Sequence, residues 1–196
     1  MSKTGYIGNR CEIRHGEIRL NGVCIFSAPE KTFSEFAKAA YRHLGLDYPK
    51  FFKMDKLSKL AFLAGSQLLQ EGTNTALVFA NRSSSMDTDL IYQESIKDAS
   101  RAYPSPSVFV YTLPNICLGE LSIKYKLYSE NSFFVFENFP VAFFPAYAGV
   151  LLESGKAEEV LCGWMEMLGE DYHALVYTVG KEGEREHTED NLKSRI

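Results

Sequence analysis

The fold is decided by one stretch of the sequence, Ser154-Gly155-Lys156-Ala157-Glu158-Glu159-Val160-Leu161-Cys162-Gly163-Trp164-Met165-Glu166. Gly155 is expected to end a helix, because glycine adopts the left-handed backbone of a helix C-terminus without steric penalty. The run that follows, residues 159–165, is short and almost continuously apolar, which is typical of a strand covered on both faces. The stretch therefore predicts a helix that leads into a buried strand.

The residues before this stretch predict a strand and a helix of unusual hydrophobicity. Residues 132–136 read Ser-Phe-Phe-Val-Phe, and we expect this most hydrophobic strand at the centre of the sheet. Residues 138–152 carry apolar side chains on nearly every side, so the pattern predicts a buried helix. Pro140 suits the first turn of that helix, whereas Pro145 falls inside it and should kink the helix or move its start.

Strands and helices alternate along the rest of the chain. Asp55 is the expected N-cap of one of the helices. This alternation indicates the α/β fold class, and 196 residues fit a single core. The predicted strands cover residues 6–14, 23–26, 75–80, 108–112 and 172–179, and the predicted helices cover residues 32–44, 55–70, 87–99 and 116–125.

The charge and the apolar runs exclude several classes of function. The formal net charge is −4, which gives no electrostatic reason to expect nucleic acid. No apolar run approaches the roughly 20 residues that span a bilayer, and residues 1–8 show no apolar signal core. We therefore expect a cytoplasmic protein with neither a nucleic-acid nor a membrane partner.

The cysteines show no metal or disulfide pattern. They are widely spaced, without a Cys-x-x-Cys pair or a histidine at ligand spacing, so free buried thiols are favoured over disulfides or a metal site. Glycine-rich phosphate loops are absent as well, and the sequence predicts no cofactor and no metal. The four cysteines are Cys11, Cys24, Cys117 and Cys162.

Residues 181–196 form a highly charged C-terminal tail. Such a segment has little to bury, and we expect it to be flexible unless a partner orders it. The predicted domain therefore covers residues 1–180.

Two further stretches carry a family resemblance together with residues 154–166. They are Phe52-Lys53-Met54-Asp55-Lys56-Leu57-Ser58-Lys59-Leu60-Ala61 and Leu113-Pro114-Asn115. In this order and spacing, the three stretches resemble the β-ketoacyl-acyl-carrier-protein synthases, the condensing enzymes of fatty-acid and polyketide synthesis. Residues 154–166 are similar to the family pattern of Gly-x-Ala-Asp, an apolar strand and Gly-Gly-x-Glu. The resemblance covers roughly residues 48–166, and residues 105–120 look most like the divergent synthases of aryl-polyene-type pigment pathways.

The resemblance implies the N-terminal half of the thiolase-like fold, with α/β/α layers around a mixed sheet of four or five strands. In complete synthases this half packs against a pseudo-symmetric sister half. A half alone should expose apolar surface, which something must cover. We expect a homodimer, or a heterodimer with a full-length ketosynthase subunit, and an acyl carrier protein is a further candidate partner.

The resemblance also locates the family's nucleophile position. Family members carry a reactive Cys in a Thr-Ala-Cys motif, on a tight elbow where a strand leads into a buried helix. Counting back without gaps from Gly155 places this position at Asn138, flanked by Glu137 and Phe139. A carboxamide is not a nucleophile, so no acyl-enzyme is expected there. The sequence therefore assigns no catalytic residue.

Two interpretations of Asn138 remain open. Asn is a preferred helix N-cap, because its side-chain oxygen accepts a backbone N–H bond. Alternatively, Asn138 is a remnant similar to the Gln that chain-length factors, the inactive partners of ketosynthases, carry at the same elbow. Glu137 is interpreted as a solvated charge at the helix start.

The other candidate residues are scattered. Family histidines belong to a second half-domain, which we do not expect in this chain, and its own histidines match no family motif, so surface or partly buried imidazoles are expected. Cys117 and Cys162 are interpreted as structural thiols. Residues 81–89 either contact an acyl carrier or a subunit, or form a solvated loop that caps the next helix. The histidines are His15, His43, His173 and His187.

Two hypotheses of function follow from the resemblance. The first is a non-catalytic, chain-length-factor-like partner of an active ketosynthase. The alternative is a 3-oxoacyl-acyl-carrier-protein synthase, an acyltransferase that another subunit completes.

Overall fold

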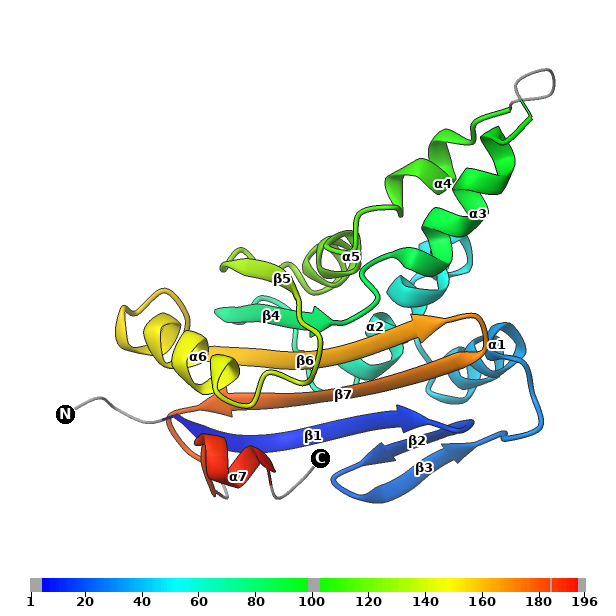
Figure 1. The fold of residues 1–196 in the computed structure, drawn as a ribbon. Coiled ribbons are helices and arrows are strands. Elements are labelled where there is room, and N and C mark those ends of the chain that lie inside the picture. The colour runs from blue at the N-terminus through cyan, green and yellow to red at the C-terminus, as the bar shows by residue number, and fades with distance from the viewer. Residues whose placement is uncertain (1–4, 99–102, 184, 194–196) are drawn as a thin grey trace.

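The computed structural model describes residues 5–98, 103–183 and 185–193 (Figure 1). The helices are α1 (Phe33–His43), the 3₁₀ helix η1 (Pro49–Lys53), α2 (Lys56–Gly65), α3 (Met86–Ile96), α4 (Pro106–Val110), α5 (Ile116–Tyr125), α6 (Phe143–Glu153) and α7 (Glu189–Lys193). The strands are β1 (Tyr6–Arg14), β2 (Glu17–Leu20), β3 (Val23–Ser27), β4 (Thr75–Asn81), β5 (Asn131–Val135), β6 (Glu159–Leu168), β7 (Asp171–Gly180) and β8 (Arg185–Glu186).

All eight strands belong to one mixed sheet. The order is β3-β2-β1-β7-β6-β4-β5, and β8 pairs with β1. Strand β4 runs parallel to β5 and β6, whereas β7 is antiparallel to both β6 and β1. The predicted α/β class and mixed sheet are confirmed, but the sheet has eight strands rather than four or five. The pattern missed β2 and β8, which are short and carry few apolar residues.

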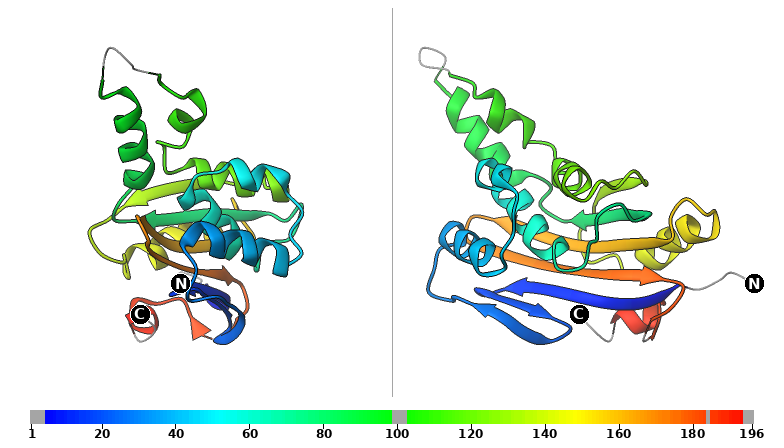
Figure 2. Two further views of the ribbon diagram at one scale, coloured as in Figure 1. Left: turned by 90° about the vertical axis from the view of Figure 1, so that its right-hand side faces the viewer. Right: turned by 180° about the vertical axis from the view of Figure 1, so that it is seen from behind.

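Helices cover both faces of the sheet, as the predicted α/β/α layers require (Figure 2). Side chains alternate along β4, so Leu77 and Phe79 belong to the core that also contains residues of α1, α2 and α5. Ala76 and Val78 point the other way and belong to a second core, together with residues of α6 and α7. Because both faces of β4 are covered, all seven of its residues are buried.

Strand β5 lies at the edge of the sheet, so its predicted central position is wrong. It pairs with β4 only. Its hydrophobicity has another cause, since Phe133 packs with the core on the α5 face and Phe134 contacts Phe143 of α6 at a ring distance of 4.7 Å. A run of apolar residues indicates that both faces of a strand are covered. It does not indicate how many strands pair with that strand.

Helices α4, α2 and α3 differ from the prediction. Residues 108–112 were expected as a strand, but Pro106 and the Ser105 cap start α4, and the Val108 amide donates to Ser105 Oγ at 3.4 Å. Helix α2 has the predicted cap, because Asp55 Oδ1 accepts from the Ser58 amide at 3.0 Å. It ends at Gly65 rather than near residue 70. Helix α3 ends at Ile96, before the predicted end at residue 99, which lies outside the described residues.

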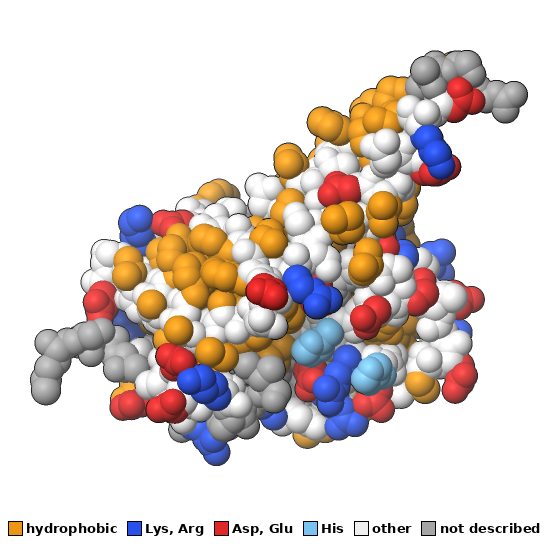
Figure 3. Space-filling model, viewed as in Figure 1, with side chains coloured by type: hydrophobic (Ala, Val, Ile, Leu, Met, Phe, Trp, Pro, Cys, Tyr) orange, Lys and Arg blue, Asp and Glu red, His pale blue; other side chains and the backbone are white. Residues whose placement is uncertain are grey.

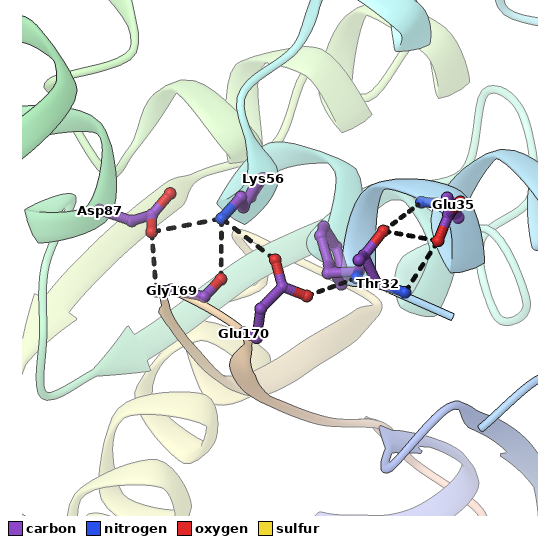
Figure 4. Close-up of polar contacts among 7 residues, drawn as sticks. Thr32, Glu35, Lys56, Asp87, Gly169 and Glu170 are labelled. Carbon is purple, nitrogen blue, oxygen red and sulfur yellow. Dashed lines mark hydrogen bonds and ion pairs between the residues drawn. The ribbon is translucent and has the colours of Figure 1, made fainter. Parts of the chain in front are cut away.

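Helices α3 and α4 form an arm that projects from the body of the molecule (Figures 1 and 2). Lys56 joins the foot of this arm to the β6–β7 turn (Figure 4). Its Nζ donates to the Gly169 carbonyl at 2.8 Å and lies 3.6 Å from Asp87 Oδ1 and 3.7 Å from Glu170 Oε1. Glu170 in turn accepts from the Phe33 amide at 2.7 Å. One ammonium group thus links the starts of α2 and α3 to the turn, and Glu170 extends the link to α1.

Part of the charged tail packs against the sheet. Tyr6 and Ile7 of β1 pair with β8, and the His187 amide donates to the Gly5 carbonyl at 2.7 Å. His187 and Leu192 are buried. Residues 184 and 194–196 of the tail lie outside the described residues.

Replacing Gly163 of β6 should destabilise the fold. A Cβ atom at this position would lie 2.8 Å from both Phe79 Cδ1 and Met165 Cε, so Gly163→Ala should lower the free energy of unfolding by about 1–3 kcal/mol. Urea denaturation measures this change. The control is Gly149→Ala in α6, where a Cβ meets nothing within 4 Å, and it should stabilise by about 0.5–1 kcal/mol. Equal effects of the two variants would contradict the assigned packing.

Candidate functional site

The β5–α6 connection, residues 136–142, contains the position assigned to the family nucleophile. It begins beside the end of β4, since the Phe136 amide donates to the Asn81 carbonyl at 2.9 Å. Phe139 anchors its middle, because this ring lies 5.8 Å from Trp164 of β6 and 5.4 Å from Phe144 of α6. The connection therefore lies at the carboxyl ends of the parallel strands β4 and β5.

Asn138 does not cap α6, so the helix-cap interpretation is wrong. The helix begins at Phe143, and its N-cap Ala142 makes no side-chain bond. Asn138 and Glu137 lie in a bend outside the helix and are exposed. Pro145 explains the later start, since a helix begun at residue 138 would hold this proline in its interior, whereas here it falls in the first turn. The predicted shift of the helix start is confirmed.

Three backbone amides around the start of α6 are already engaged. The Val141 amide donates to the Phe139 carbonyl at 3.0 Å, and the amides of Phe143 and Phe144 donate to the Pro140 carbonyl at 3.1 and 3.2 Å. Proline has no N–H, so Pro140 and Pro145 add no donor. Stabilising an oxyanion requires free donors aimed at the developing charge. The three engaged amides are not free donors and therefore cannot stabilise an oxyanion.

The buried thiols are not activated for nucleophilic attack. All four cysteines are free, and only Cys24 is exposed. Burial raises the pKa of Cys11 to about 12 and raises the pKa values of Cys117 and Cys162 well above the ordinary thiol value. The thiolate is the reactive form. The interpretation of Cys117 and Cys162 as structural thiols agrees with their positions in α5 and β6.

None of the histidines belongs to the β5–α6 connection. His15 lies in the β1–β2 turn, His43 ends α1, and His173 lies in β7. His187 differs from the expectation because it is fully buried, with Nε2 lying 3.1 Å from Tyr177 Oη. Burial lowers its pKa to about 4. A neutral, enclosed imidazole is a packing element rather than a base open to a substrate.

Residues 81–89 cover the last residue of β4, a short loop and the start of α3. Asn81, Ser85 and Thr88 are buried, so the segment is not a fully solvated loop, whereas Arg82 and Met86 are exposed. Contact of this segment with an acyl carrier or a subunit stays a prediction. Asn81 exchanges two hydrogen bonds of 2.8 Å with the backbone of Ser84. The amide of Arg82 donates to Glu166, the last residue of the stretch that decided the fold. The polar composition alone did not reveal this burial.

The described residues contain no cluster of three His, Cys, Asp or Glu side chains that could hold a metal ion. Within the same ranges, no helix is long and apolar enough to cross a membrane.

The buried His187 predicts a pH dependence of stability. Its pKa is lowered from 6.5 to about 4 in the folded protein, so the unfolded chain binds a proton first as the pH falls from 6.5 towards 4. The free energy of unfolding should therefore fall over this window, by up to about 1.4 kcal/mol per pH unit. Urea titrations between pH 7 and pH 5 measure the slope. His187→Gln should flatten it and the exposed His43→Gln should not, and the same slope in both variants would contradict the assignment.

Comparisons with known proteins support the fold. No protein-family model and no curated protein sequence matches the chain. Solved structures do match. One of them is a ketosynthase in complex with its chain length factor from Xenorhabdus doucetiae. It matches with a TM-score of 0.64 and 17% identity, over 92% of this chain and 80% of that chain. The ishigamide ketosynthase/chain length factor matches with a TM-score of 0.65 and 15% identity, over 93% of this chain and 64% of that chain. A type II polyketide acyl-carrier protein in complex with its ketosynthase matches with a TM-score of 0.60 and 12% identity, over 98% of this chain and 65% of that chain. The chain therefore has the thiolase-like fold of ketosynthases and chain length factors, as its sequence resemblance implied.

Proposed function

We propose that this chain is a non-catalytic, chain-length-factor-like partner of an active ketosynthase in fatty-acid or polyketide-type synthesis. The observation that carries the proposal is the exposed carboxamide of Asn138 at the assigned nucleophile position, in a connection where three nearby amides are engaged. A carboxamide cannot form a thioester with an acyl group. The buried thiols of Cys117 and Cys162 offer no substitute, because burial raises their pKa values. These contacts do not favour the alternative, a condensing enzyme completed by another subunit.

The face formed by β5 and α6 supports a protein partner. Val135 of β5 is 55% exposed and Val150 of α6 is 61% exposed. Hydrophobic side chains gather over these two elements (Figure 3). The outer edge of β5 pairs with no strand that the structure describes, and an open, apolar edge strand invites association. A partner subunit would cover both the side chains and the strand edge.

The arm offers a second apolar surface. Leu90 and Ile91 of α3 and Phe109 and Val110 of α4 are all more than 45% exposed. Large exposed apolar patches mark protein interfaces. We assign both surfaces to a ketosynthase subunit, because solved structures with this fold include ketosynthases in complex with their chain length factors. An acyl carrier protein is a further candidate partner, since one of the similar structures contains it bound to its ketosynthase.

The proposal also covers domain organisation and location. We treat residues 1–180 as a ketosynthase-like domain and residues 181–196 as a tail that adds β8 and α7. We place the protein in the cytoplasm, because all four of its cysteines are free thiols and reducing compartments maintain that state.

Restoring the family's cysteine should not restore acyl transfer. Asn138→Cys places a thiol in an exposed bend outside the first turn of α6, where the helix dipole does not lower its pKa. Incubation with an acyl-carrier thioester should leave the variant and the native chain without an acyl adduct, as intact mass spectrometry reports. An adduct on a native cysteine would overturn the non-catalytic assignment, and rapid acylation of the variant would refute the inactive geometry.

A charge on α6 should break the proposed complex. Val150→Lys places a cation on the β5–α6 face and should abolish co-purification of a full-length ketosynthase with the tagged chain from its native cell. The matched control is Val23→Lys on β3, because Val23 is 66% exposed and lies at the far edge of the sheet. Equal capture by both variants would exclude this face as the interface. A native chain that remains a monomer and captures no ketosynthase would exclude the proposed function.

A further inference from the structure

A polar pocket of about 270 Å³ lies at the amino ends of β4 and β6, at the opposite end of β4 from the β5–α6 connection. Thr75, the first residue of β4, and Glu159, the first residue of β6, line it together with Thr178 of β7. One water needs only about 10–15 Å³ of such space, so the pocket has room for a small organic molecule. The segment between α2 and β4 also lines the pocket, through Leu68, Gln70, Thr73 and Asn74.

The sheet is polar at this pocket, although the same face is apolar further along each strand. Thr75 is 2% exposed and Thr178 is 6% exposed, so two hydroxyl groups are buried beside the core. Burying a hydroxyl group is unfavourable unless it forms a hydrogen bond. Side chains two positions apart share a face of the sheet, and two positions from the pocket residues of β4, β6 and β7 the core contains Leu77, Leu161 and Val176.

A β-bulge in β1 accommodates the Thr178 side chain. Gly8 and Asn9 both lie opposite Thr178, at the register shift between β1 and β7. A Cβ at Gly8 would lie 2.6 Å from Thr178 Oγ1, so a side chain at this position would displace the hydroxyl group. The bulge also brings Asn9 into the pocket lining. Bulges commonly re-aim side chains beside functional sites.

The hydroxyl groups of the pocket have too few protons for their contacts. Thr73 Oγ1 lies 3.1 Å from the Gln70 carbonyl and 2.9 Å from Thr75 Oγ1. Thr75 Oγ1 also lies 3.3 Å from Glu159 Oε1. Each hydroxyl group carries one proton, so two protons serve three contacts. A ligand that donates hydrogen bonds would supply the missing proton.

The acids of the pocket face no cation from its lining. Glu158 and Glu159 line the pocket, whereas no lysine, arginine or histidine is among the lining residues. Glu159 is partly buried, and burial raises the pKa of its carboxyl group, which the bond from Thr75 only partly offsets. A partly desolvated carboxylate is stabilised by a positive charge close to it. The pocket therefore favours a cation that carries N–H groups.

We propose that this pocket binds a small primary ammonium compound that carries hydroxyl groups. The ammonium group has three N–H donors, and it would bond to Glu159 and Thr75, whose side-chain oxygens lie 3.3 Å apart. This site does not depend on the proposed partner role. Carboxamides both donate and accept, and the hydroxyl groups of the ligand would bond to those that line the pocket, Asn9, Gln70 and Asn74.

Titration of the native chain with three probes, followed in its amide NMR spectrum, tests each part of the proposal. Serinol carries an ammonium group and two hydroxyl groups, glycerol has a hydroxyl group in place of the ammonium group, and isopropylamine lacks the hydroxyl groups. Serinol should bind about tenfold more tightly than either of the others, because only serinol makes both kinds of bond. It should shift the amide signals of Thr75 and Glu159. No binding of serinol, or equal binding of glycerol or isopropylamine, would overturn the proposal.

A glutamate variant locates the site. Glu159→Gln removes the charge and keeps the shape of the side chain, and it should weaken serinol binding about tenfold. The matched control is Glu30→Gln, whose exposed side chain lies between β3 and α1, outside the pocket, and its affinity should be unchanged. If circular dichroism shows that Glu159→Gln is unfolded, Thr75→Val replaces it with the same expected loss. Unchanged affinity in the folded pocket variant, or an equal loss in Glu30→Gln, would refute the assigned site.

Discussion

The burial of β6 between two neighbours of opposite direction is the constraint on which the rest of the structure depends. One edge of β6 pairs in parallel with β4 and the other in antiparallel with β7. Its alternating residues join two cores, since Leu161 packs with the α2 face and Val160 and Cys162 pack with the α6 face. The close approach of Phe79 leaves room only for glycine at position 163. A buried parallel strand needs helical crossovers, which place α5 and α6 on opposite faces of the sheet.

The position at which α6 begins decides which groups the β5–α6 connection exposes. The family places a cysteine on a tight elbow where the helix dipole and free amides can activate it. Here two prolines surround a later start, Phe139 anchors the segment on Trp164, and three amides near the start of α6 bond to nearby carbonyls. Asn138 is left facing solvent. The exposed carboxamide and the engaged amides both favour the proposal that this connection holds no nucleophile.

The same architecture leaves two apolar surfaces uncovered, and each has a distinct origin. The β5–α6 face is exposed because the sheet ends at β5. The arm is exposed because α3 and α4 project from the body, and they pack on each other through contacts such as the 5.4 Å ring pair of Tyr92 and Phe109. Lys56 holds the foot of the arm to the β6–β7 turn, so the arm presents its surface in a defined direction.

The sequence by itself determined the helices and strands that depend on residues close together in the chain. The apolar run of β4, the helical spacing of α5 and the Asp55 cap of α2 all depend on residues within a few positions of one another, and each was predicted. Only the tertiary structure decided that β5 is an edge strand and that His187 is buried. These features depend on contacts between different elements, such as β5 with β4 and Tyr177 with His187. The helix at residues 106–110 has a local signal, the Ser105 cap and Pro106, which the prediction of a strand did not take into account. Hydrophobic periodicity reports whether a side chain is covered, but it does not report which segment covers it.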